Sequence, residues 1–275
     1  MSRDRVGLSF HESFALNLPA IRAVLALSRE RDGEITSKAI RDQTALGPNY
    51  VKSMPQYARA CGLMEIGNYK LTPFGDLVSR DDPQLQNHNT LWLMHYHISA
   101  PQGPGPAFWS HLVGGFLTFG EEVGRNEIVE EIAGFDQRQR DKALQLRTER
   151  TAATVFLGTY TKSDGLGPLG LLETFGERDT YVRVSESQSP PLGATACALG
   201  DYWAAHFGEQ LTVSLGELAK DGGFARVMWM DHLCLDEVLS SLNRMNIVDL
   251  YRVAPPFQVA RRWTNQDELL ARLYR

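Results

Sequence analysis

The chain has 275 residues, of which 43% are hydrophobic and 22% charged, and a net charge of -5; this is the composition of a globular protein with a real core and does not suggest nucleic-acid binding by itself. No apolar run approaches the roughly 20 residues of a membrane span, and the N-terminal stretch lacks an apolar signal core, so we expect a cytoplasmic protein. Three widely spaced cysteines outside any CxxC pair argue against a disulfide framework or a cysteine zinc site.

Charge is divided unevenly along the chain. Residues 1–80 carry eleven Lys and Arg against eight Asp and Glu, a net of +3, whereas the rest carries 17 against 25, a net of -8. A mildly basic front on an acidic body suits a DNA-contacting module attached to a partner-binding body. Chance scatter of charge is the alternative explanation.

Residues 1–81 have the pattern of a winged helix-turn-helix. Apolar residues at helical spacing predict helices over residues 18–30, 34–46 and 48–61. Gly67-Asn68 is a two-residue hairpin signal between short apolar runs, and Thr72-Pro73 begins a further helix. Helix, short helix, turn, helix and hairpin in this order predict a winged helix at the N-terminus.

The third helix of such a unit usually enters the major groove of DNA, while the hairpin touches the backbone. We expect base contacts from Asn49, Gln56 and Arg59. Phosphate contacts are expected from Lys38, Arg41, Lys52, Ser53 and Lys70. Tyr50 would pack against sugar or backbone. Pro55 lies in mid-helix, where it removes a backbone bond and kinks the axis, so a winged helix that contacts protein is the alternative.

Residues 82–190 are predicted to form a mainly helical middle domain. Residues 89–100 are apolar and aromatic and predict a buried helix, after which the Pro and Gly of residues 101–106 predict a loop. Further helical stretches are expected within residues 108–119, 126–135 and 149–160. A strand is expected over residues 178–185.

Residues 191–275 are predicted to form a second winged-helix-like unit. Helices are expected over residues 194–207, within 212–220 with Thr212 or Ser214 as the cap, and over 231–246 and 265–275, and strands over 247–253 and 257–263. The exposed face of its third helix carries Asp236, Glu237, Ser240, Ser241, Asn243 and Arg244. The two carboxylates would repel phosphate, so this unit is predicted to contact protein. A contact with the DNA backbone is still possible through three arginines of the predicted wing, Arg252, Arg261 and Arg262.

The sequence offers no catalytic or metal-binding signature. His95 and His97 are two apart on a predicted helix and would point to different sides, so they would not chelate a metal together. His11 and Glu12 are interpreted as a buried, bonded pair that fixes the chain at the domain entrance. Glycine-rich stretches lack the lysine and hydroxyl of a phosphate-binding loop. We therefore predict a non-enzyme without metal or cofactor.

Four segments in order, FHESFALN, LGPNYVKSM, DDPQLQNHNTLWLMHYHI and DGLGPLGLLE, resemble a bacterial family known as a domain of unknown function. Its members sit among genes for DNA phosphorothioation and related phage defence, often beside a protein resembling phosphoadenosine phosphosulfate reductase. The resemblance covers residues 8 to about 173 and implies participation in DNA modification or defence, with no catalytic residues. Pro48 and Pro55 stand where the family pattern has basic residues, which lowers the positive charge of the third helix.

The leading hypothesis is a DNA-binding accessory protein of a phosphorothioation-type or phage-defence system. The N-terminal winged helix would bind double-stranded DNA, and the acidic helical body would bind a partner enzyme. One alternative is a protein-interaction adaptor that never touches DNA. The other is a winged-helix transcriptional regulator, which predicts a dimer with half-sites about 34 Å apart.

Overall fold

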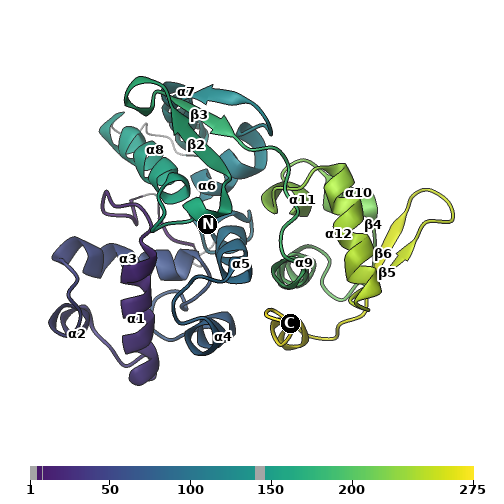
Figure 1. The fold of residues 1–275 in the computed structure, drawn as a ribbon, viewed down its shortest axis with the longest axis horizontal. Coiled ribbons are helices and arrows are strands. Elements are labelled where there is room, and N and C mark those ends of the chain that lie inside the picture. The colour runs from purple at the N-terminus through teal and green to yellow at the C-terminus, as the bar shows by residue number, and fades with distance from the viewer. Residues whose placement is uncertain (1–4, 8, 140–145) are drawn as a thin grey trace.

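The structure is a computed structural model and describes residues 5–7, 9–139 and 146–275. Helices dominate these residues, together with two small antiparallel sheets, as the ribbon in Figure 1 shows. A hydrophobic cluster of buried residues extends through the described chain, from Phe10 to Leu273. None of the helices in this part of the chain is long and apolar enough to cross a membrane.

The N-terminal part contains four helices. They are α1 (Leu18–Glu30), α2 (Ser37–Gln43), α3 (Pro48–Ala60) and α4 (Pro73–Asp81). Three start at a side chain that accepts a hydrogen bond from a backbone N–H of the first turn, which satisfies an otherwise unpaired donor. These N-caps are Asn17, Thr36 and Thr72. The predicted succession of helices is therefore confirmed at this end of the chain.

The predicted hairpin after α3 is reduced to one antiparallel bridge between Met64 and Leu71. In the loop between them, the carbonyls of Glu65 and Asn68 accept hydrogen bonds from the guanidinium of Arg59 instead of from a neighbouring strand. Helix α3 also runs unbroken through the buried Pro55. The hydrogen bonds of Arg59 hold the loop against α3, and Pro55 does not end the helix.

The middle part is a helical layer with a small sheet. Its helical segments are α5 (His88–Ser99), α6 (Ala107–His111), the π-helical turn η1 (Leu112–Phe116), α7 (Arg125–Gln139), α8 (Leu146–Thr161) and the short 3-10 turns η2 (Gly167–Leu169) and η3 (Glu177–Asp179). Its strands are β1 (Glu122–Gly124), β2 (Leu172–Phe175) and β3 (Tyr181–Val184), in the order β1-β3-β2. The sequence predicted only the third strand. The other two are three and four residues long, too short for an alternating pattern to stand out.

The C-terminal part is a helix–strand–helix–hairpin arrangement. Its elements are α9 (Leu192–His206), β4 (Thr212–Ser214), α10 (Leu215–Ala219), α11 (Phe224–Val227), α12 (His232–Arg244), β5 (Val248–Tyr251), β6 (Gln258–Arg261) and α13 (Gln266–Leu270). Of the two caps expected for the helix within residues 212–220, Ser214 is the N-cap residue of α10. Residues 212–214 also pair with β6 in the sheet of order β4-β6-β5, a short strand that the sequence did not predict.

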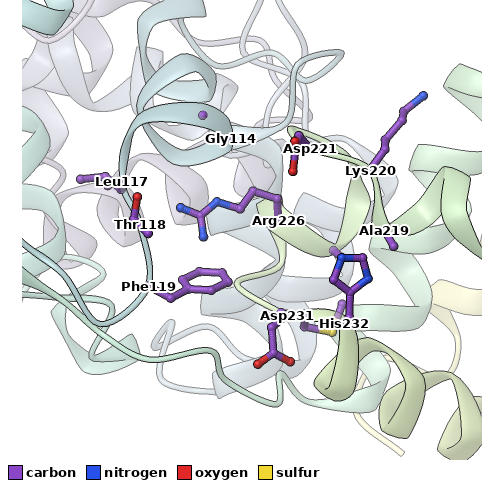
Figure 2. Close-up of a pocket in the computed structure, with 13 residues that line it drawn as sticks. Gly114, Leu117, Thr118, Phe119, Ala219, Lys220, Asp221, Arg226, Asp231 and His232 are labelled. Carbon is purple, nitrogen blue, oxygen red and sulfur yellow. The ribbon is translucent and has the colours of Figure 1, made fainter.

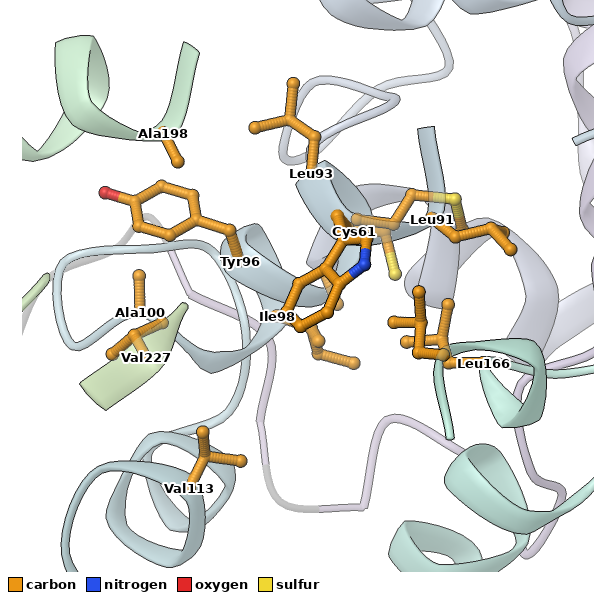
Figure 3. Packing of buried hydrophobic residues seen from close by; sticks show 14 of the residues in the cluster. Cys61, Leu91, Leu93, Tyr96, Ile98, Ala100, Val113, Leu166, Ala198 and Val227 are labelled. Carbon is orange, nitrogen blue, oxygen red and sulfur yellow. The ribbon is translucent and has the colours of Figure 1, made fainter. Parts of the chain in front are cut away.

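The C-terminal part is attached through α9, which packs against the buried α5, while α13 packs against α9 and α4. Figure 3 shows the apolar side of this contact, with Ala198 of α9 beside Tyr96 of α5. A polar contact crosses the same junction, because the buried His95 imidazole uses Nε2 to donate to the Val227 carbonyl at 2.9 Å. Its Nδ1 lies 2.8 Å from the Tyr160 hydroxyl. These contacts join α5 to the middle and C-terminal parts, and the His97 ring of α5 lies 5.6 Å from the Phe74 ring of α4 in the N-terminal part.

Candidate functional site

Five of the side chains predicted to contact DNA are exposed on adjoining elements, and we call them the α2–α3 surface. The surface consists of Lys38, Arg41, Asn49, Lys52 and Lys70. On α2, two cations are three residues apart and so lie on one side of the helix. Asn49 and Lys52 have the same spacing on α3. Four cations and one amide thus lie on neighbouring helical faces and on the loop beside them.

Local contacts hold the loop that bears Lys70 against α2. The Ser37 hydroxyl at the start of α2 lies 3.0 Å from the Tyr69 hydroxyl. On the other side, Gly33 has a φ of +74°, and a Cβ there would lie 2.8 Å from the Cα of Lys70. Glycine is therefore required both by the backbone conformation and by the close approach of the two segments. The Lys70 side chain is placed beside α2 by these two contacts.

The cations of the α2–α3 surface are largely free of carboxylate partners. Within the described residues, Lys38, Lys52 and Lys70 form no ion pair. Arg41 lies 3.7 Å from the carboxylate of its neighbour Asp42, with both side chains more than half exposed. Such an exposed pair is worth less than about 1 kcal/mol. The surface can therefore meet an anionic ligand without first breaking strong internal ion pairs.

Two other predicted contacts, Ser53 and Arg59, are buried. Ser53 is fully buried and its hydroxyl donates to the Asn49 carbonyl at 2.9 Å. Arg59 is 7% exposed; its guanidinium donates to the Glu65 and Asn68 carbonyls and lies 5.0 Å from the centroid of the Tyr69 ring. Both polar groups form hydrogen bonds inside the fold, so neither side chain is available to contact DNA.

Tyr50 and Gln56 are half-buried. The Tyr50 ring packs edge-on against Phe14, with centroids 5.0 Å apart. The burial of α3 on two sides is visible in the sequence, because Tyr57 and Ala60 stand at helical spacing from Ser53 and mark a second buried stripe. This second stripe accounts for the burial of Ser53, whereas Arg59 is buried because its guanidinium donates to carbonyls of the loop after α3.

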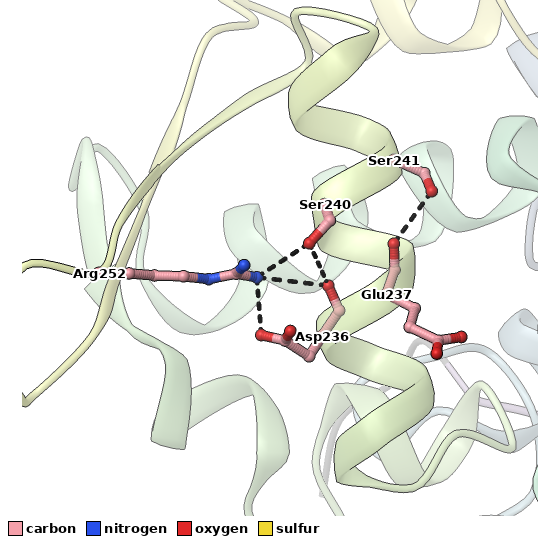
Figure 4. A network of polar contacts seen from close by, with 5 residues as sticks. All are labelled: Asp236, Glu237, Ser240, Ser241 and Arg252. Atoms are coloured by element: carbon pink, nitrogen blue, oxygen red, sulfur yellow. Dashed lines mark hydrogen bonds and ion pairs between the residues drawn. The ribbon is translucent and has the colours of Figure 1, made fainter.

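The C-terminal unit presents a different surface, in which charges are paired (Figure 4). The Arg252 guanidinium of the β5–β6 hairpin lies 2.7 Å from a carboxylate oxygen of Asp236 on α12 and donates to the Ser240 hydroxyl at 3.0 Å. The other two arginines that could contact the DNA backbone also form ion pairs, Arg261 with Glu209 and Arg262 with Asp249. The tip of the hairpin is exposed and apolar, and Val253 is 100% exposed.

Buried titratable groups lie away from both surfaces. The expected pair of His11 and Glu12 is wrong, because the buried His11 accepts a hydrogen bond from the Ser13 backbone N–H while Glu12 is exposed. His97 Nε2 lies 3.6 Å from an Asp201 carboxylate oxygen at the α5–α9 junction, beside a cavity of about 360 Å³. Burial lowers the pKa of His97 to about 4 and raises the pKa of Asp201 to about 7.

The described residues bring no three His, Cys, Asp or Glu side chains together in a way that could hold a metal ion. His95 and His97 face different partners, as their spacing on a helix predicted. We take the α2–α3 surface, with four exposed cations and one exposed amide, as the candidate site. Lys and Arg side chains commonly contact phosphates in protein–DNA complexes, and an amide can contact a base edge.

Comparison with known proteins identifies the family. The family model described as "Protein of unknown function (DUF4007)" matches residues 9–274, and the chain belongs to this family. Two crystal structures of a protein named SspB have a similar fold, one of them magnesium ion-bound, with TM-scores of 0.79 and 0.76. Each is 16% identical and aligns with 96% of this chain and 86% of that chain. A comparison with curated proteins gives no match.

Proposed function

We propose that this member of the DUF4007 family is a non-enzymatic accessory protein of a bacterial DNA-modification or phage-defence system, and that it binds double-stranded DNA through the α2–α3 surface. The observation that carries the proposal is the set of exposed cations Lys38, Lys52 and Lys70, which have no ion-pair partner among the described residues. The resemblance to a family found among phosphorothioation genes supports the cellular setting.

We propose distinct roles for the side chains of this surface. Lys38, Lys52 and Lys70 would contact phosphates, and Arg41 would join them at small cost because its pair with Asp42 is exposed. Asn49 lies in the first turn of α3, where its amide can make two hydrogen bonds to an adenine edge. With Arg59 buried, base contacts are few, so this surface would bind DNA with a weaker sequence preference than the sequence suggested.

We further propose that a partner enzyme binds the acidic body of the chain, including the C-terminal unit. The paired arginines and the exposed apolar tip formed by Tyr251, Val253 and Phe257 favour protein over phosphate as the contact there. A protein resembling phosphoadenosine phosphosulfate reductase is the partner class that the family resemblance implies. Co-purification of such a partner with the wild-type chain, and its loss with Val253→Asp, would support this part of the proposal.

The proposal is tested by fluorescence anisotropy with short duplexes, unmodified and phosphorothioated, at several salt concentrations. We expect micromolar or tighter binding that weakens steeply with salt, since each phosphate contact releases counterions. The double variant Lys38→Ala/Lys52→Ala should lower the slope of log K against log salt by about two units. Arg244→Ala removes an exposed cation on α12 and serves as the matched control.

Preference for the phosphorothioated duplex would place the protein in modification sensing, and equal affinity would indicate general backbone binding. No binding to either duplex at low salt would overturn the DNA part of the proposal. In that case the adaptor function, supported by the C-terminal apolar tip, becomes the leading hypothesis.

A further inference from the structure

A second candidate site lies between the middle part and the C-terminal unit, far from the α2–α3 surface. Its pocket encloses about 440 Å³ between the turn η1 with the loop that follows it and the segments around α11 and the start of α12. Figure 2 shows the side chains that line it. This volume is within the range of small-molecule sites in proteins.

The feature that distinguishes this pocket is the guanidinium of Arg226. Its Cζ lies over the Phe119 ring, 3.9 Å from the ring centroid, and 5.9 Å from the centroid of Trp229. Burial lowers its pKa from the ordinary value, yet an arginine stays protonated in proteins. A fixed positive charge is therefore held in a partly desolvated position.

Arg226 has no hydrogen-bond acceptor and no ion-pair partner in the described part of the chain. The other half-buried arginines differ: Arg5 donates to the Gly105 and Pro101 carbonyls, and Arg59 donates to two loop carbonyls. An unpaired charged donor away from bulk water is costly. The stacked guanidinium keeps its planar donor edge available, which is the geometry that binds an oxyanion with two parallel hydrogen bonds.

The other charges around the pocket leave Arg226 as its principal anion-binding group. Lys220 is paired with Glu217 at 3.2 Å. Asp231 is occupied as the N-cap of α12, where it accepts the Cys234 N–H at 2.8 Å. Asp221 is exposed and raises the pKa of Arg226 without forming an ion pair with it. The remaining titratable group at the pocket, His232, is exposed at the start of α12.

Two glycines of η1, Gly114 and Gly115, line one side of the pocket. A Cβ on Gly115 would meet nothing within 4 Å, whereas a Cβ on Gly114 would lie 3.5 Å from the Cα of Gly222. The absence of side chains at these two positions leaves space on this side of the pocket. Nearby apolar residues, including Leu117 and Met230, offer a surface for the uncharged part of a ligand.

We propose that this pocket binds the phosphoryl group of a nucleotide-sized small molecule, with Arg226 as the group that holds the phosphoryl oxygens. The contacts with Phe119 and Trp229 restrict where the guanidinium can lie, so that it is positioned at the pocket before the ligand arrives. The volume leaves room for a ring or sugar beyond a single phosphate, and the apolar wall accommodates it. A Lys in the same position would supply a charge but not the planar pair of donors.

The test is isothermal titration calorimetry of the full chain with three probes: inorganic phosphate, adenosine 5′-monophosphate and adenosine. We expect the monophosphate to bind and adenosine not to bind. Arg226→Met should weaken the binding of the monophosphate about tenfold or more, because a charge-assisted pair of hydrogen bonds is lost. Arg226→Lys should weaken it less. Arg244→Met removes an exposed arginine of α12 and should leave it unchanged.

Arg226→Met is expected to fold, because the wild-type guanidinium makes no hydrogen bond and a methionine can still cover Phe119; circular dichroism checks this. Should it not fold, Arg226→Lys and Phe119→Leu supply the same comparison. Binding of inorganic phosphate alone as tightly as the monophosphate would still support a phosphoryl site. Absence of binding at millimolar probe, equal affinity in Arg226→Met, or an Arg226 dependence of duplex binding instead of monophosphate binding would overturn the proposal.

Discussion

At the scale of single residues, an arginine serves two different purposes in this chain depending on its acceptors. Arg59 was predicted to contact a base edge but donates to the carbonyls of Glu65 and Asn68, so it organises the loop after α3. Arg226 has no acceptor and lies over an aromatic ring. The same side chain is structural where the backbone supplies oxygens and available to a ligand where it does not.

The structural role of Arg59 predicts a loss of stability on truncation. Arg59→Ala should lower the free energy of unfolding by about 2–3 kcal/mol, because two loop carbonyls lose a charged donor. Lys52→Ala, at an exposed position about two turns away on α3, should change it by less than about 0.5 kcal/mol. Urea denaturation at neutral pH measures both. A near-neutral Arg59→Ala would show that the loop does not depend on the guanidinium.

Buried histidines predict an acid-sensitive fold. Burial lowers the pKa of His11, His95 and His97 to about 4, against 6.5 for the ordinary side chain. The unfolded chain therefore binds more protons than the folded chain between about pH 6.5 and 4, so stability is lost as the pH falls through this window. Burial raises the pKa of Asp201 to about 7, so this carboxyl group makes the folded state more stable as the pH falls. It is one group against three histidines with the opposite effect.

The pH prediction is tested by urea denaturation of the wild type and of His95→Gln between pH 7 and pH 4.5. The wild-type free energy of unfolding should fall with pH. The variant should be less stable at pH 7. Its free energy of unfolding should change less with pH, with a slope shallower by up to about 1.4 kcal/mol per pH unit, the effect of one proton. Equal slopes for the two proteins would contradict a neutral, buried His95.

At the scale of elements, close backbone packing fixes the position of α4 beside the loop after α3. A Cβ added to Gly75 would lie 1.9 Å from the Leu63 carbonyl oxygen, whereas one on Gly47 would meet nothing within 4 Å. Gly75→Ala should therefore cost about 2 kcal/mol or more, and Gly47→Ala less than about 1 kcal/mol. Thermal unfolding of the two variants compares them directly. Similar melting temperatures would show that α4 can move away at little cost.

The ion pair that joins the β5–β6 hairpin to α12 should contribute little to the free energy of unfolding. Arg252 and Asp236 are 40% and 46% exposed, so solvent screens their attraction. A double-mutant cycle with Arg252→Ala and Asp236→Ala should give a coupling energy of about 1 kcal/mol or less. A coupling well above this value would indicate that the hairpin is held rigidly on α12.

The elements also show what the sequence could and could not predict. Helices with caps such as Thr36 and Thr72, and with clear apolar stripes, were predicted in the correct order. Strands β1 and β2 were missed because they are too short for an alternating pattern, and β1 in addition pairs with β3, which is distant in sequence. The pocket around Arg226 was missed for the same reason, since Phe119 and Arg226 are more than 100 residues apart.

At the scale of the whole molecule, α5 connects the N-terminal, middle and C-terminal parts. It packs against α9, and His95 donates to the Val227 carbonyl across the junction. The domain boundaries after residues 81 and 190 remain predictions of the sequence. We expect one cooperative unfolding transition by calorimetry, with equal calorimetric and van't Hoff enthalpies. Two separated transitions would show that the junction is weak and that the parts fold as independent domains.

The central claim, that the α2–α3 surface contacts duplex DNA, is tested most directly by site-specific crosslinking. The native cysteines Cys61, Cys197 and Cys234 are buried, so a cysteine placed at Asn49 offers a selectively exposed thiol for a photoreactive group. If this surface contacts DNA, we expect crosslinks to a duplex from Asn49→Cys, and none above background from Arg244→Cys on α12. Crosslinks from position 244 with none from position 49 would contradict it.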